Sequence, residues 1–169
     1  MVKPQLNDVP KYYRSYIEEV IDKNIIEYFS EQKDSVVKLF SSISEERSQY
    51  RYAESKWSIK EILGHLCDSE RIFMTRALRF ARNEKQELTG FDENEYVAAS
   101  NFSELPIEIL INDFVKMRES HLALFKTFND VIWARKGTAN KSEFTVSLIL
   151  YIMAGHVDHH IKIIKERYL

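Results

Sequence analysis

The segment Ala154-Gly155-His156-Val157-Asp158-His159-His160 places two histidines four residues apart inside an amphipathic helix pattern. On a helix this spacing puts the imidazoles of His156 and His160 about 40° apart around the axis and one turn apart along it, so both lie on one face. Apolar residues on either side recur at steps of four and three, which marks that face as the core side of a helix from about Thr145 to Tyr168. The series runs Ile149, Met153, His156, His160, Ile163.

A second helix has a clear start signal. Ser58 and Glu61 form a capping-box pattern directly before an apolar run, which predicts a helix from Ser58 to about Arg82. Its core stripe contains His65 and Glu70 among apolar residues. The segment from Asn83 to Asn101 is expected to be a loop, because it contains a turn signal at Thr89-Gly90-Phe91-Asp92.

Three further segments carry helical periodicity. Together with the two helices above, they predict an all-α fold, a four-helix bundle with a short extra N-terminal helix, formed by a single domain of residues 1–169. A loop is expected at Lys136 to Asn140. The three segments are a short helix from Tyr12 to Val20, a long helix from about Asn24 to Ile43, and a third bundle helix from about Glu104 to Phe128.

Composition agrees with helices and excludes several classes of protein. Four glycines and three prolines in 169 residues are too few for a sheet of many short strands. Lys and Arg total 24 against 26 Asp and Glu, with no basic run, so we expect no nucleic-acid partner. The first residues, Met1 to Asn7, contain no apolar signal core, and no apolar run is long enough to span a bilayer, so we expect no membrane partner. Its single cysteine, Cys67, favours a reducing compartment, and we expect a cytoplasmic protein.

The histidine pair predicts a metal site that needs a third ligand. Two imidazoles on one buried face compete for the same few hydrogen-bond partners, and a divalent ion resolves this by accepting one nitrogen from each. His65, on the core face of the second helix, is the leading third ligand, and His121 on the third helix is its competitor. Cys67 lies about 200° around the helix from His65 and cannot serve the same ion. We therefore predict metal ligands at His65, His156 and His160.

Three histidine ligands leave an open coordination position, which is typical of a catalytic ion. Imidazole ligands suit Zn and Ni, and the sequence does not choose between these metals. Val157 follows His156 where zinc proteases of the HExxH type carry a glutamate base, so protease chemistry is not supported. No catalytic residue can be assigned.

Three polar residues near the histidines have open roles. His159 is either close to the metal or substrate, or an ordinary half-exposed flank residue. Glu70 enters an apolar surface and needs a partner, so it either pairs with a buried arginine, the reading we favour, or orients a metal-bound histidine. Asp68 is expected to be a surface charge, with a contact to a ligand histidine as the alternative.

Several motifs, in order along nearly the whole chain, resemble the DinB-like family, four-helix-bundle metalloenzymes that include the bacillithiol transferases. The resemblance implies a three-histidine site at His65, His156 and His160, and a homodimer. It also implies a small-molecule substrate, and in some relatives a low-molecular-weight thiol activated by the ion. The motifs are Tyr50-Arg51-Tyr52, Lys56-Trp57-Ser58-Ile59-Lys60-Glu61-Ile62-Leu63-Gly64-His65-Leu66, Asp68, Glu70-Arg71, Arg76-Ala77-Leu78-Arg79-Phe80-Ala81-Arg82, Gly90-Phe91-Asp92, Tyr96, Arg135-Lys136-Gly137-Thr138-Ala139-Asn140, Ala154-Gly155-His156, His159-His160 and Lys165-Glu166-Arg167-Tyr168-Leu169.

The leading expectation is a metal-dependent enzyme that transfers a group to a bacillithiol-type thiol. One alternative is a metal-dependent hydrolase. A second is a non-enzymatic metal-binding stress-response protein, which would need a fully caged ion with a fourth protein ligand such as His121. A third is a structural bundle whose buried histidines bind no metal.

Overall fold

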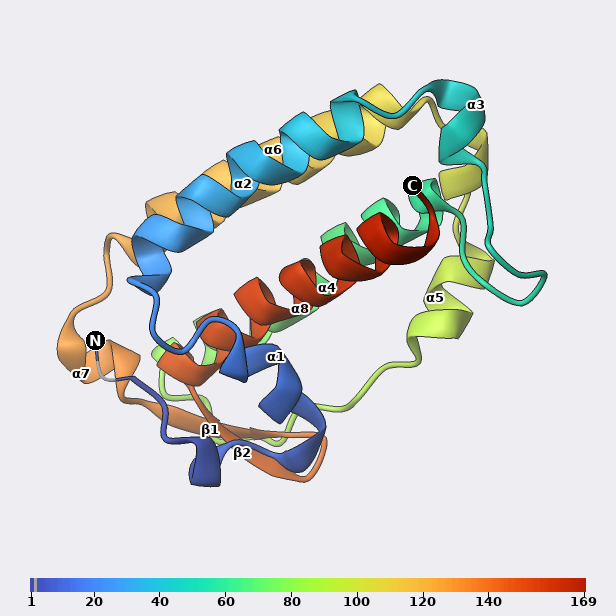
Figure 1. Cartoon of the computed structure of the whole chain (residues 1–169). Coiled ribbons are helices and arrows are strands. Elements are labelled where there is room, and N and C mark those ends of the chain that lie inside the picture. Colours follow the sequence, from blue (N-terminus) through green and yellow to red (C-terminus); the bar gives the residue numbers. More distant parts are fainter. Residues whose placement is uncertain (2) are drawn as a thin grey trace.

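Four long helices form a bundle (Figure 1), which confirms the predicted all-α four-helix architecture. The computed structural model describes residues 1 and 3–169. None of the helices in this part of the chain combines the length and the apolarity needed to cross a membrane. The bundle helices are α2 (Ile25–Ser41), α4 (Ile59–Ala81), α6 (Ile107–Phe125) and α8 (Val146–Arg167).

The order of the helices around the bundle differs from their order in the sequence. Helix α2 packs against α6 and α8, and α4 also packs against α6 and α8, so α2 and α4 occupy opposite corners. Helices α2 and α8 run in the same direction, whereas α4 runs antiparallel to α8 (Figure 1). This arrangement brings the N-terminal half of α4 beside the C-terminal half of α8.

Short helices connect and cover the bundle. The predicted N-terminal helix is present as α1, but it is shorter than expected and packs against α8. The expected loop from Asn83 to Asn101 instead contains α5, whose N-terminal cap Asp92 accepts hydrogen bonds from the backbone N–H groups of Asn94 and Glu95. The short elements are η1 (Leu6–Asp8), η2 (Lys11–Tyr13), α1 (Arg14–Glu18), α3 (Glu45–Ser48), α5 (Glu93–Ala99), η3 (Phe102–Glu104) and α7 (Asp130–Trp133).

A small hairpin replaces the loop expected at Lys136 to Asn140. Strands β1 (Lys136–Ala139) and β2 (Ser142–Thr145) pair antiparallel across a two-residue turn. The turn residues Asn140 and Lys141 have φ angles of 45° and 61°, the left-handed conformation that tight hairpins require at both central positions. The expectation failed because this turn lacks the glycine that normally signals such a hairpin.

The start of α4 follows the predicted capping box. The Ser58 hydroxyl accepts from the backbone N–H of Glu61, and the Glu61 carboxylate accepts from the backbone N–H of Ser58. Two N–H groups that have no partner within the helix are satisfied in this way. The cap fixes the first turn of α4, and with it the position of His65 two turns later.

Two apolar clusters form the core, one toward the hairpin and one toward α3. Some buried polar side chains come from the middle of α4 and α6. Among them, Arg118 donates to the Glu70 carboxylate at 2.6 Å, and the other Glu70 oxygen lies 3.0 Å from His121 Nδ1. Arg118 also donates to the carbonyl of Phe29 at 3.1 Å. The buried glutamate is therefore neutralised within the bundle.

Replacing Arg118 by Met should destabilise the fold strongly, because the Glu70 carboxylate would stay buried without its cation. We expect a loss of about 3–5 kcal/mol in the free energy of unfolding, measured by urea denaturation. The double variant Arg118→Met with Glu70→Leu should recover much of this loss, since no uncompensated charge remains. Equal stability of the single variant and the unmodified chain would show that the ion pair has no structural role.

Candidate metal centre

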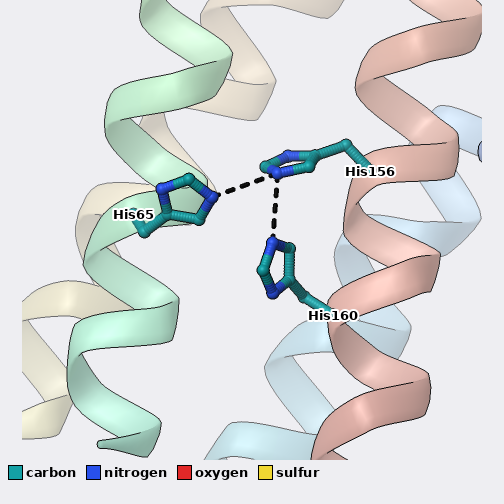
Figure 2. Close-up of side chains that lie close together, drawn as sticks. All are labelled: His65, His156 and His160. Atoms are coloured by element: carbon teal, nitrogen blue, oxygen red, sulfur yellow. Dashed lines mark hydrogen bonds between the residues drawn. The ribbon is translucent and has the colours of Figure 1, made fainter. Parts of the chain in front are cut away.

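Three histidines converge between α4 and α8 (Figure 2). His156 Nε2 lies 3.1 Å from His65 Nε2 and 3.1 Å from His160 Nε2. One ligand nitrogen from each ring falls within 4.8 Å of the others. Antiparallel packing of the two helices produces this cluster. It brings His65 and His156 together although they are 91 residues apart in the chain.

The nitrogen positions fit a single divalent ion. Two nitrogens at 2.0–2.1 Å from a tetrahedral ion lie about 3.3 Å apart, close to the observed separations. His156 Nε2 faces two other imidazole nitrogens, and one neutral ring nitrogen cannot satisfy both with one proton or one lone pair. A cation placed among the three would accept all of the lone pairs.

Burial keeps these imidazoles in the form that binds metal. It lowers the pKa of His65 to about 4. The pKa values of His156 and His160 also lie well below the ordinary value, because of burial and then the proximity of the other histidines. All three rings are therefore neutral near pH 7, with a lone pair available for coordination.

Ser69 lies in contact with the first of these histidines. Its hydroxyl oxygen lies 3.3 Å from His65 Nδ1, one helical turn further along α4, and the side chain is buried. When Nδ1–H donates to this oxygen, Nε2 keeps its lone pair and points toward α8. Such a partner on the distal nitrogen is the usual companion of a metal-binding histidine.

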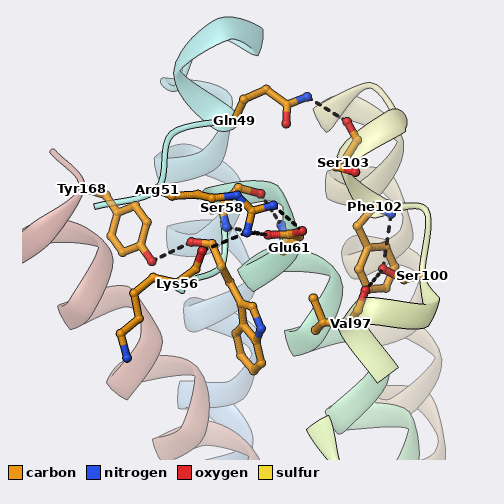
Figure 3. A network of polar contacts seen from close by, with 11 residues as sticks. Gln49, Arg51, Lys56, Ser58, Glu61, Val97, Ser100, Phe102, Ser103 and Tyr168 are labelled. Atoms are coloured by element: carbon orange, nitrogen blue, oxygen red, sulfur yellow. Dashed lines mark hydrogen bonds and ion pairs between the residues drawn. The ribbon is translucent and has the colours of Figure 1, made fainter. Parts of the chain in front are cut away.

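Trp57 covers the histidines from the side of the α4 cap. Its ring centroid lies 4.6 Å from that of His65, and its ring is nearly parallel to that of His160 at 6.4 Å. A polar network holds the backbone on either side of Trp57 (Figure 3): the Tyr168 hydroxyl donates to the Trp57 carbonyl at 2.8 Å, and Arg51 donates to the carbonyl of Lys56. The tryptophan is thus fixed as a wall of the site.

Helix α1 reaches the site because α8 carries a glycine at position 155. A Cβ atom on Gly155 would lie 1.9 Å from the carbonyl oxygen of Tyr16, so only glycine permits this contact. The Tyr16 ring then lies 5.7 Å from the His156 ring and 4.9 Å from the His159 ring. Burial raises the pKa of the Tyr16 hydroxyl, which stays protonated and can donate a hydrogen bond.

A cavity of about 410 Å³ opens onto the three histidines. Aromatic rings form much of its wall, and polar groups of α4, α5 and the hairpin border it further from the histidines. The volume is large enough for a small molecule, and it reaches all three proposed ligands. A ligand in this cavity would meet an ion at its open coordination side.

The other candidate residues take different places. His121 on α6 lies against Glu70 and does not join the cluster. Cys67 is buried in the apolar cluster toward α3. Glu70 forms the expected ion pair with a buried arginine, and Asp68, whose carboxyl pKa is raised by burial, lies near Arg71. Only His159 borders the cavity.

Reasoning from the sequence missed most of the cavity wall. Ser69 could have been found from its position four residues after His65 on the same helix face. Arg76 lies on α4, eleven residues after His65, a spacing of about three turns that returns to the same helix face. Tyr16 and Trp57 come from other segments, and no spacing rule connects them with the histidines. The sequence predicts a turn at Gly90, and the structure places this residue at the cavity.

Comparison with known proteins agrees with this architecture. Among solved structures, YfiT from Bacillus subtilis, described as a probable metal-dependent hydrolase with an unusual four-helix bundle topology, matches with a TM-score of 0.72 at 18% identity, over 98% of this chain and 90% of that chain. A mycothiol-dependent maleylpyruvate isomerase matches with a TM-score of 0.67 at 13% identity, over 93% of this chain and 61% of that chain. At these identities the two structures establish a shared fold.

No protein with a curated description matches the sequence. The family model of the DinB superfamily matches residues 28–164, which include α4, α6, most of α2 and α8, and the three clustered histidines. The chain therefore belongs to the DinB superfamily.

Proposed function

We propose that the protein is a metal-dependent enzyme that joins a low-molecular-weight thiol to a small electrophilic substrate. The observation that carries this proposal is the convergence of three Nε2 atoms, from His65, His156 and His160, at the wall of a cavity. These residues would hold a divalent ion, with Zn and Ni best suited to imidazole ligands. When bound, such an ion supplies Lewis acidity that lowers the pKa of a thiol or a water molecule at its open position.

The residues around the histidines fit group transfer. Trp57 and Phe73 give the cavity apolar walls, which exclude water and accommodate the carbon skeleton of a substrate. In the reaction, a bond forms between sulfur and the electrophilic carbon, the leaving group departs with its electron pair, and the thiol proton passes to solvent. Tyr16 lines the cavity with its ring 5.7 Å from that of His156, and burial keeps its hydroxyl protonated, so Tyr16 is the candidate donor of a hydrogen bond to a departing anion.

A thiol nucleophile suits this site better than water does, because it needs less help from a protein base. His159 borders the cavity beside Tyr16, but burial lowers its pKa, which makes it a weaker base than an ordinary histidine. The fold match to a mycothiol-dependent isomerase also supports the use of a thiol.

Hydrolysis is the second candidate, supported by the description of YfiT as a probable metal-dependent hydrolase. A non-enzymatic role would favour a caged ion with a fourth protein ligand. Among the described residues, no fourth His, Cys, Asp or Glu joins the three histidines, and a cavity opens beside them. These observations favour an enzyme over a storage or stress-response metal protein.

Metal content should depend on the clustered histidines. The purified chain is expected to hold about one divalent ion, and His156→Ala should lose most of it, because two ligands bind far more weakly than three. Elemental analysis measures both. A chelator should lower the thermal midpoint of the unmodified chain, since the ion binds only the folded state.

His121→Ala is the matched control for this experiment. It also removes a buried imidazole, but one that contacts Glu70 and not the cluster, so its metal content should equal that of the unmodified chain. Equal metal content in His156→Ala and the unmodified chain would contradict the assignment of the site. An unchanged thermal midpoint after chelation would favour a purely structural role for the histidines.

Consumption of an electrophile should depend on a thiol. Bacillithiol or mycothiol reacts with monochlorobimane to give a fluorescent thioether. We expect this thioether to form faster when the metal-loaded chain is present than when the protein is omitted. The acceleration should disappear in His65→Ala. Fluorescence measures the rate directly. Hydrolysis of a model ester at a rate independent of thiol, without thioether formation, would favour the hydrolase and overturn the transferase.

A further inference from the structure

Three cationic Lys and Arg side chains are buried in the described part of the chain, and only two of them have a carboxylate partner. Lys60 pairs with Glu45, and Arg118 pairs with Glu70. Arg76, which is 6% exposed, forms no ion pair with any carboxylate of the described residues. A buried guanidinium without a countercharge is costly to the fold, so its presence calls for a reason.

Arg76 lines the cavity, and its guanidinium has two hydrogen-bond partners within the described part of the chain. Its Nη2 donates to the carbonyl of Thr89 at 3.0 Å, and the side chain also shares a hydrogen bond with Tyr13. Burial raises the pKa of the Tyr13 hydroxyl, so this partner is neutral and supplies no countercharge. A guanidinium carries five N–H donors, and the two contacts leave enough of them for a further acceptor.

The cavity connects Arg76 with the histidine cluster. Arg76 and His156 both line it, and Phe73 is near both, with its ring 6.2 Å from the His156 ring and 5.7 Å from the Arg76 guanidinium carbon. Because both distances are measured from the Phe73 ring, the guanidinium carbon can be no more than about 12 Å from the His156 ring. A small molecule can therefore reach both ends at once. Glu93, an acidic residue of the same wall, lies outside ion-pair distance of Arg76.

We propose that Arg76 binds the carboxylate of a small acidic substrate, whose apolar middle lies along Phe73 and whose reactive end faces the histidine cluster. The assignment of the reactive end rests on the proposed function; the carboxylate site does not. A carboxylate matches the planar fork of the guanidinium, and its single charge balances the single unpaired cation. A phosphate dianion would bring a second negative charge for which the described cavity wall has no further arginine or lysine.

Binding of brominated probes to the metal-free, thiol-free chain tests this site. Bromine quenches a nearby indole, and Trp57 lines the cavity, whereas Trp133 is buried in the core toward the hairpin. Half-maximal quenching should need a concentration of 6-bromohexanoate at least about 10-fold lower than that of 6-bromohexanamide. A ratio of this size corresponds to the free energy of one charge-assisted hydrogen bond. The preference should disappear in Arg76→Met and in Arg76→Gln, and Gln can keep a hydrogen bond to Thr89 if Met impairs folding.

Arg79→Met is the matched control. Arg79 lies one turn further along α4, pairs with Glu84, and borders with Arg76 a separate outer cleft that excludes Trp57. This variant should keep the full preference for the carboxylate; its loss there would place the ligand in the outer cleft and overturn the proposal. Three other results would also overturn it. They are equal binding of the carboxylate and the amide by the unmodified chain, a preference for the carboxylate that survives in both Arg76 variants, and tighter binding of 5-bromopentyl phosphate than of the carboxylate. Because no metal is present, these outcomes are independent of the metal site.

Discussion

The antiparallel packing of α4 against α8 is the constraint on which the site depends. It brings His65 within 3.1 Å of His156, although the two are 91 residues apart in sequence. The packing is sustained by the two apolar clusters of the core. Two glycines let other segments approach these helices closely: the Phe102 ring of η3 fills the place of a side chain at Gly64 on α4, and the backbone of Tyr16 in α1 does so at Gly155 on α8. The cluster is therefore a consequence of helix packing more than of any loop.

The buried polar groups differ in whether the protein itself satisfies them. Both oxygens of Glu70 have cationic or hydrogen-bonding partners within the bundle. The nitrogens of the histidine cluster face one another at a cavity. Arg76 carries a buried charge that no carboxylate of the described residues balances. Unbalanced polar groups around one cavity are what a ligand-binding site requires.

The sequence predicted what depends on periodicity and caps. The four long helices, the start of α4 at Ser58 and the inward direction of the three histidines followed from spacing, because a helix converts spacing into direction. Helix α5 and the hairpin escaped prediction, since both are short and their signals are local turn conformations such as that of Asn140. The cavity wall escaped as well. Tyr16 and Trp57 meet the histidines only through tertiary packing, and one sequence holds no record of that packing. Arg76 shares the helix face of His65 and could have been found from its spacing.

The central claim is that three imidazoles of this chain hold one metal ion. X-ray absorption at the metal edge of the purified chain, dialysed into thiol-free buffer, counts the ligands and their distances directly. The account predicts three histidine nitrogens at about 2.0–2.1 Å, with the remaining position filled by oxygen from solvent. A sulfur ligand at about 2.3 Å, which only Cys67 or a methionine could supply, or a spectrum with fewer than two imidazoles, would contradict it.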